Sequence, residues 1–151
     1  MGDDLTHAVT RGLCRLLWHH GLAPLTEVPL PDGHRADVMA VGPDGRLWIA
    51  EVKTSWDDLR FDRKWPAYRA WCDLFLWAVP VDLAPALEAE TFLPDATGLV
   101  VADAHGAVFA RPGRSMPLPP ARRRALTIRL ARVAATRALR LTDPGLDGAA
   151  S

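Results

Sequence analysis

The sequence predicts an α/β fold in which a mixed sheet is flanked by helices, and three observations support this prediction. Within residues 35–53, two apolar runs are separated by a tight turn, as in an antiparallel hairpin. Residues 57–72 follow at once with apolar residues at helical spacing, which is typical of a crossover helix. The continuous apolar run 74–79 then has the composition of a strand buried on both faces.

The first 34 residues predict a helix and a strand. Asp3 or Asp4 can cap the helix, its apolar residues recur with a period of 3.6, and Gly21 ends it. Residues 22–30 read as the first strand, and the turn at 31–33 leads into the hairpin. Glu27 is the lone acid in that apolar strand.

The loop sequence of the hairpin predicts its register. Pro43 presets the first loop position, Asp44 suits the second, and Gly45 can adopt a positive φ. If these three residues form the loop, counting outward places Asp37 opposite Glu51 on the neighbouring strand. Two carboxylates then meet across the end of an otherwise apolar hairpin.

Lys53 joins this pair, because side chains of a strand alternate between faces and residues 51 and 53 share one. Opposed carboxylates repel each other, and a divalent cation would remove the penalty. Mg²⁺ is bound in proteins by one or two carboxylates together with water and phosphate oxygens, and it acidifies a bound water. The pattern therefore favours phosphodiester hydrolysis. For Glu51-Val52-Lys53 taken alone, the alternative to a catalytic role is a chance E-x-K sequence whose charges form ordinary ion pairs.

On these residues the chain resembles the PD-(D/E)XK nuclease superfamily, with Asp37 as the Asp of the motif and Glu51 and Lys53 as its (D/E)XK. Ala36 stands where the literal motif has Pro. More narrowly, the chain is similar to the MmcB family of bacterial DNA-repair proteins over about residues 24–135. The segments that carry this likeness are 35–37, 48–55, 62–68, 72–80, 98–107 and 120–126.

The resemblance implies a restriction-endonuclease-like core in which Asp37 and Glu51 hold Mg²⁺ or Mn²⁺. The backbone carbonyl of Val52 is a further metal ligand by the same likeness. Lys53 would orient or help deprotonate the attacking water and stabilise charge on the phosphate.

Other residues are weaker candidates for the site. Glu27 could supply a fourth acid, or else be an edge charge or a partner for Arg35. Lys64 and Tyr68 could reach a scissile phosphate from the crossover helix. His34 could act as a base, although a solvated turn histidine explains it better, and capping explains the acids of the first helix better than a metal role does.

The second half of the chain predicts more strands and an Arg-rich helix. Strands are expected at 98–102 and 108–111, followed by a proline-rich connector and a helix over 121–141. Residues 1–141 would form a single nuclease-like domain, and residues 142–151 a loose tail.

Basic residues are concentrated in the C-terminal part of the chain, although the net charge is zero. No acid occurs between Asp103 and Asp143, and nine of the 18 basic residues lie there. This asymmetry suits contact with phosphates, and a solvated helix face is the alternative. We expect the DNA-binding residues to include Arg122, Arg123, Arg124 and Arg129.

Composition excludes several other classes. Cys14 and Cys72 lack zinc spacing and read as reduced core residues, and no nucleotide-binding glycine motif is present. The acidic start and the lack of a long apolar run indicate a cytoplasmic protein, associated with the nucleoid if it acts on DNA. The prediction is a metal-dependent DNA nuclease of DNA repair acting on damaged or branched DNA. A catalytically silent DNA-binding or partner-recruiting module is the alternative, and a homodimer is compatible with the sequence.

Overall fold

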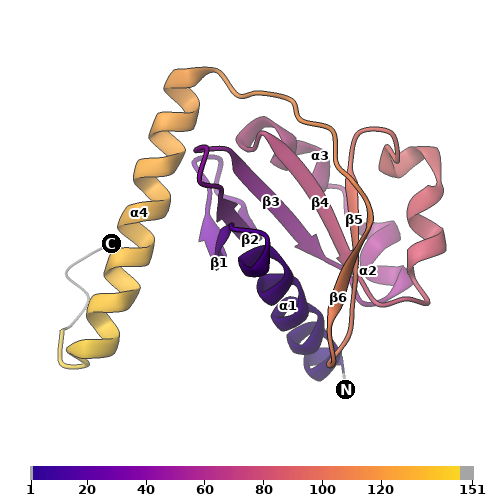
Figure 1. Cartoon of the computed structure of the whole chain (residues 1–151), viewed down its shortest axis with the longest axis horizontal. Coiled ribbons are helices and arrows are strands. Elements are labelled where there is room, and N and C mark those ends of the chain that lie inside the picture. Colours follow the sequence, from indigo (N-terminus) through magenta and orange to yellow (C-terminus); the bar gives the residue numbers. More distant parts are fainter. Residues whose placement is uncertain (1, 147–151) are drawn as a thin grey trace.

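A six-stranded mixed sheet forms the centre of the structure, a computed structural model that describes residues 2–146 (Figure 1). The strands follow one another across the sheet in chain order. They are β1 (Ala23–Pro29), β2 (Arg35–Val41), β3 (Leu47–Val52), β4 (Leu74–Val79), β5 (Gly98–Ala102) and β6 (Ala107–Arg111). The pairs β3–β4 and β4–β5 are parallel, and the pairs β1–β2, β2–β3 and β5–β6 are antiparallel. The predicted mixed sheet is therefore confirmed.

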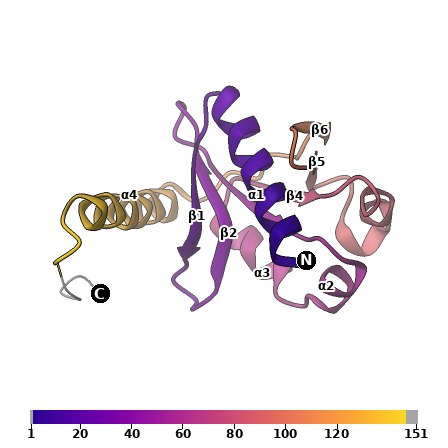
Figure 2. The ribbon, with the colours of Figure 1, turned by 90° about the horizontal axis from the view of Figure 1, so that it is seen from below.

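Helices cover both faces of this sheet. Helix α1 (Gly2–His19) packs across one face through Val9, Leu13 and Leu17. On the other face, short helices pack against the aromatic side chains of β4 (Figures 1 and 2). Trp77 lies within 4.9 Å of the Trp65 ring, centroid to centroid. The candidate site lies on this second face.

The hairpin β2–β3 has the register that its loop predicts. The Gly42 N–H donates to the Arg46 carbonyl over 2.9 Å, and Gly45 has a φ of 85°. Met39 pairs with Ile49 in the resulting ladder. The three-residue loop thus fixes which face each side chain occupies.

The helix predicted over 57–72, in which Pro66 could introduce a kink, is broken more completely than the sequence suggests. The structure breaks it into α2 (Trp56–Phe61), α3 (Trp65–Tyr68) and the 3-10 helix η1 (Arg69–Trp71). Pro66 lies in the first turn of α3, where its missing N–H costs nothing, so a new helix begins beside it. The break places Asp62 between two helices.

The C-terminal half matches the predicted elements closely. Two 3-10 helices, η2 (Ala84–Glu88) and η3 (Glu90–Phe92), precede β5, and the long helix α4 runs over Pro120–Thr142. Figure 2 shows α4 standing beside β1 at the edge of the sheet. Leu126 and Leu130 are the residues that it buries. The predicted loose tail falls partly on residues 147–151, which lie outside the described residues.

Smaller predictions have clear outcomes. Asp3 and Asp4 lie inside the first turn of α1 rather than before it, where they complement the positive end of the helix dipole. The His20 ring contacts the Leu16 carbonyl at the other end of that helix. Cys14 and Cys72 are free thiols. Between residues 2 and 146, no helix has the length and apolar character needed to cross a membrane.

Candidate active site

Asp37 and Glu51 lie where the ladder between β2 and β3 ends. The last backbone pair joins Val38 to Ala50, and the next step of the register is Asp37 opposite Glu51. At this step the side-chain carboxylates, rather than backbone carbonyls, accept the hydrogen bonds between the strands. The Asp37 N–H donates to Glu51 Oε2 over 2.8 Å, and the Val52 N–H donates to Asp37 Oδ2 over 2.9 Å. Each strand therefore holds the carboxylate of the other.

Both carboxylates are buried and poorly compensated. Glu51 is 4% exposed and Asp37 is half-buried. Burial, and next the negative charge of Asp37, raise the pKa of Glu51 to about 8, while the N–H of Asp37 and the Lys53 ammonium oppose that rise. Burial also raises the pKa of Asp37. The two acids consequently share a site that disfavours two negative charges.

Lys53 extends the site, and Asp62 holds its ammonium. Lys53 Nζ lies 2.6 Å from Asp62 Oδ2, and the side chains are 14% and 3% exposed. Burial alone would raise the pKa of Asp62, but the hydrogen bond from Lys53 and the N–H groups of Lys64 and Trp65 bring it below its usual range. Asp62 is thus an ionised partner that fixes the position of the lysine.

Asp62 is a site residue that the sequence pattern did not single out. Its other oxygen accepts hydrogen bonds from the backbone N–H groups of Lys64 and Trp65, at 2.7 and 3.1 Å. An Asp placed shortly before a Pro at a helix start is a capping signal. That signal could have located the break, but it could not have shown that the carboxylate also binds Lys53.

Glu27 lies next to the acid pair without joining it. The β1–β2 register pairs Thr26 with Val38, so the following step places Glu27 opposite Asp37. Glu27 instead adopts a left-handed φ of 52°, and its exposed side chain lies 3.7 Å from the Arg35 guanidinium. The structure therefore agrees with the alternative of an edge charge paired with Arg35. Its charge still acts in the direction that raises the pKa of Asp37.

Tyr68 borders the site from α3. It is buried, and its hydroxyl donates to the Arg35 carbonyl over 3.2 Å. Burial, and next the charges of Glu51 and Asp37, raise its pKa above its usual range. His34 lies against the Tyr68 ring and contacts the Asp32 carboxylate at 2.9 Å. Tyr68 is therefore a neutral side chain at the edge of the acid pair.

Lys64 is exposed, at the residue that precedes α3. Its N–H is bound by Asp62, but its ammonium makes no ion pair among the described residues.

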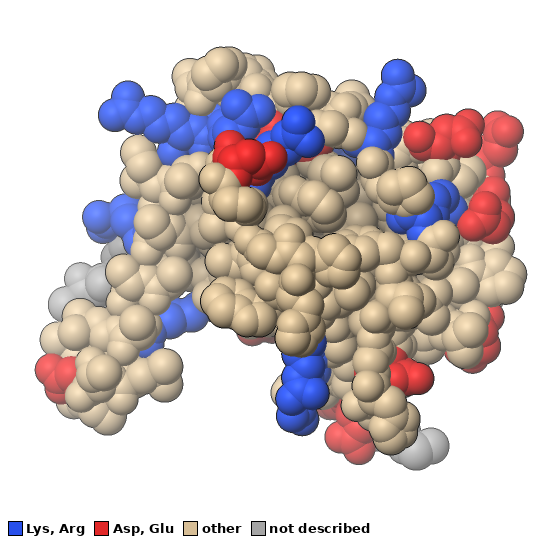
Figure 3. Space-filling view, in the orientation of Figure 1, with Lys and Arg blue, Asp and Glu red and all other residues tan. Residues whose placement is uncertain are grey.

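The four arginines predicted to bind DNA have different surroundings on α4. Arg123 forms an ion pair with the buried Asp73, and its Nε donates a hydrogen bond to that carboxylate over 3.0 Å. Arg122 lies over the Trp71 ring and donates to the Ala70 carbonyl. Arg124 is exposed, and Arg129 reaches the Pro29 carbonyl at 3.5 Å. Lys and Arg side chains gather mainly around α4, whereas acidic ones gather mainly at the opposite edge (Figure 3).

The donor set fits a hard cation with few protein ligands. Oδ1 of Asp37 and Oε1 of Glu51 accept no hydrogen bond within the described part of the chain. Among residues 2–146, no group of three or more His, Cys, Asp or Glu side chains is arranged to hold a metal. Two carboxylates suffice for Mg²⁺ when water and substrate oxygens complete its coordination. The role of the Val52 carbonyl stays a prediction.

Comparison with known proteins places these residues in a wider group. The family described as "DNA repair protein MmcB-like" matches residues 3–145. A solved structure of a protein of unknown function from Silicibacter pomeroyi is 37% identical, with 97% of each chain covered and a TM-score of 0.86. No curated protein matches the chain. The family match includes the candidate site as well as α4.

Proposed function

The chain belongs to the MmcB-like family of DNA repair proteins, and from this premise we propose that it is a metal-dependent nuclease that hydrolyses phosphodiester bonds of DNA. The observation that carries the proposal is the opposed pair Asp37 and Glu51, with Lys53 on the same strand end. A strand hairpin that ends in this triad is the core of the PD-(D/E)XK superfamily, to which we assign the fold.

Asp37 and Glu51 would hold Mg²⁺ or Mn²⁺ through their second oxygens. Both pKa values are raised by burial, so a divalent cation would stabilise the ionised pair that the protein alone disfavours. The bound metal would supply a nucleophilic water and neutralise charge on the phosphate.

Lys53 is the group that would act on the attacking water or on a phosphate oxygen. Asp62 holds the ammonium in place through an ion pair. The positive charge of Lys53 also acts on both acids, since it lowers the pKa of Asp37 and of Glu51 against the larger effect of burial. A positioned cation of this kind contributes through preorganisation. The arginines of α4 would hold the DNA backbone without reading sequence.

A second function is favoured by one observation. The Lys53 ammonium already has a carboxylate partner at 2.6 Å, and the metal would have only two carboxylate ligands. The same fold could then act as a catalytically silent module that binds DNA or recruits a repair partner.

Cleavage of defined DNA structures separates the two functions. Purified protein should cut at least one of a panel of branched, mismatched, abasic, nicked and single-stranded substrates, and only with Mg²⁺ or Mn²⁺. Lys53→Ala should slow cleavage by about a hundredfold or more while DNA affinity changes little. Arg60→Ala is the matched control, since it removes an exposed cation that pairs with Asp57.

Equal cleavage rates of wild type and Lys53→Ala on every substrate would support the catalytically silent module. Cleavage that persists in EDTA would also contradict the proposal, since it would make the acid pair irrelevant to the reaction.

A further inference from the structure

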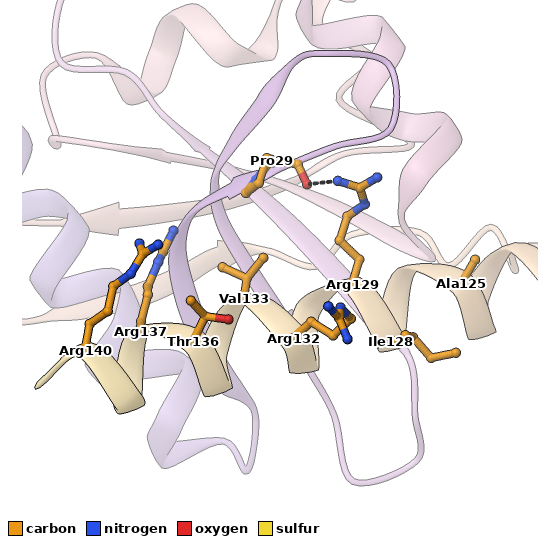
Figure 4. A pocket seen from close by; sticks show the side chains of 9 residues that line it. All are labelled: Pro29, Ala125, Ile128, Arg129, Arg132, Val133, Thr136, Arg137 and Arg140. Carbon is orange, nitrogen blue, oxygen red and sulfur yellow. Dashed lines mark hydrogen bonds between the residues drawn. The ribbon is translucent and has the colours of Figure 1, made fainter. Parts of the chain in front are cut away.

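A groove separates α4 from β1 at the edge of the sheet. It has a volume of about 570 Å³, and all its lining residues belong to α4 except Pro29 of β1. Figure 4 shows Arg129, Arg137 and Arg140 pointing from the helix toward β1, with Val133 between them. α4 buries only Leu126 and Leu130, and beyond Leu130 the side chain of Arg137 still contacts β1.

The groove is strongly basic. Of the nine residues that line it in the described part of the chain, four are arginines and none is acidic. Arg129 and Arg137 donate to backbone carbonyls of β1, at Pro29 and at Thr26 and Glu27. These contacts involve neutral carbonyls, so they leave the positive charge uncompensated, and a guanidinium has five donors to share. Arg132, between them on the helix, is exposed to solvent.

Apolar carbon lies among these charges. Ile128 is 49% exposed, and Val133 and Pro29 contribute further apolar surface to the groove. A ligand that alternates anionic groups with flat or apolar groups fits this lining. A nucleic acid strand has that character, because its phosphates alternate with sugars and bases.

The groove lies one strand away from the acid pair. Arg137 holds the carbonyls of Thr26 and Glu27, and Glu27 is the residue that the register places opposite Asp37. Neighbouring strands are about 5 Å apart, so a phosphate bound in the groove would be only a few nucleotides from Asp37 and Glu51. An acidic peptide would satisfy the arginines equally, but it would gain nothing from this proximity.

From these contacts we propose that the groove between α4 and β1 binds the sugar-phosphate backbone of a single nucleic acid strand and leads it to the acid pair. The proposal deepens the proposed function and rests on it for the identity of the strand as DNA. It assigns phosphate contact to Arg129 and Arg132, and it assigns Arg122 and Arg123 to the protein's own structure.

Binding in the absence of metal tests the groove independently of cleavage. A fluorescently labelled 20-nucleotide single strand and the corresponding duplex are titrated in EDTA by anisotropy at several salt concentrations. Arg132→Ala should weaken binding of the single strand roughly tenfold and reduce the salt slope by about 1. Arg132→Lys keeps the charge and should recover most of the affinity.

Arg15→Ala is the matched control, because Arg15 is an exposed arginine of helix α1 outside the groove. It should change affinity by less than about twofold. Thermal melting of each variant establishes that the helix is intact.

Equal affinity of wild type and Arg132→Ala would overturn the proposal, and so would an equal loss of affinity in Arg15→Ala. A groove that serves a second copy of the chain would show itself as a change of mass by light scattering in Arg132→Ala. Binding of poly-glutamate without binding of DNA would assign the groove to an acidic protein. These binding measurements need no cleavage, so they test the groove even if the wild type cuts no DNA. The groove and the nuclease activity are therefore tested independently.

Discussion

Two buried carboxylates lie at opposite ends of β3, Asp73 beside its first residue and Glu51 near its last, and they have different hydrogen-bond partners. Asp73 is 1% exposed and Glu51 is 4% exposed. Asp73 accepts hydrogen bonds from the backbone N–H groups of Leu47 and Leu118, each over 2.8 Å, and pairs with Arg123. Glu51 accepts one backbone N–H and faces the carboxylate of Asp37.

The pKa values follow from this difference. Burial would raise the pKa of Asp73, but the hydrogen bonds from Arg123, Leu47 and Leu118 bring it below its usual range. Burial, and next the negative charge of Asp37, raise the pKa of Glu51 to about 8, and the Asp37 N–H and the Lys53 ammonium oppose the rise only in part. A buried acid with a full set of donors holds the fold together, whereas a buried acid left next to another acid indicates a ligand site.

The largest expected effect is on cleavage, through Glu51→Gln. The change keeps the shape of the side chain and removes the charge that would bind the metal. Cleavage should fall about a thousandfold. The free energy of unfolding at pH 7 should rise by roughly 3 kcal/mol, because folded Glu51 is mostly protonated and resembles Gln, whereas the unfolded wild type gains an ionised glutamate that Gln cannot supply. Single-turnover cleavage with Mg²⁺ and urea denaturation measure the two effects.

Glu90→Gln is the control for that substitution, since Glu90 is exposed and remote from β3 in the chain. Cleavage by Glu51→Gln within tenfold of the wild type would show that the reaction does not need the Glu51 carboxylate. Glu51 and Asp73 would then not differ in function.

The second effect is on stability, through Asp73→Asn. The amide cannot satisfy Arg123 and both N–H groups together, so the buried network is broken. The free energy of unfolding should fall by about 3 kcal/mol, which lowers the melting temperature by roughly 10 °C. Cleavage per folded molecule should stay within about twofold of wild type at low temperature.

Asp82→Asn provides the matched control, because Asp82 is exposed and makes no hydrogen bond among the described residues. If Asp73→Asn proved as stable as this control, the number of hydrogen-bond donors around a buried carboxylate would not distinguish Asp73 from Glu51.

The sequence predicts one of these carboxylates and misses the other for a physical reason. The loop 43–45 fixes a register, and a register fixes which side chains meet, so Asp37 and Glu51 could be paired from local chemistry alone. Asp73 and Arg123 are 50 residues apart, and only the packing of α4 brings them together.

The same limit explains the other differences between prediction and structure. Arg123 and Arg124 are adjacent and alike in sequence, but one faces Asp73 and the other faces solvent. The ion pair of Asp62 joins it to Lys53, which is nine residues away on another element. Helical periodicity describes each segment correctly, but it does not contain the tertiary contacts that orient a charge or end a helix.

The smallest effect, counted per pH unit, is the pH dependence of stability, on which Glu51 and Asp73 should act in opposite directions. Metal-free protein in EDTA should lose stability as the pH rises from about 5 to about 8, by roughly 1 kcal/mol per pH unit. In this window the folded protein keeps a proton on Glu51, whose pKa is about 8, while the unfolded chain has released it. Asp37, with its pKa also raised, acts in the same direction.

Asp73 and Asp62 have lowered pKa values, so their contribution is lost only as the pH falls below about 4. The two windows therefore do not overlap, and urea denaturation from pH 5 to pH 8 reports the acid pair alone among these four groups. Glu51→Gln should flatten the slope, whereas Glu90→Gln should leave it unchanged. An equal slope in wild type and Glu51→Gln would mean that Glu51 is ionised throughout, because only a group that changes its protonation on unfolding can give stability a dependence on pH.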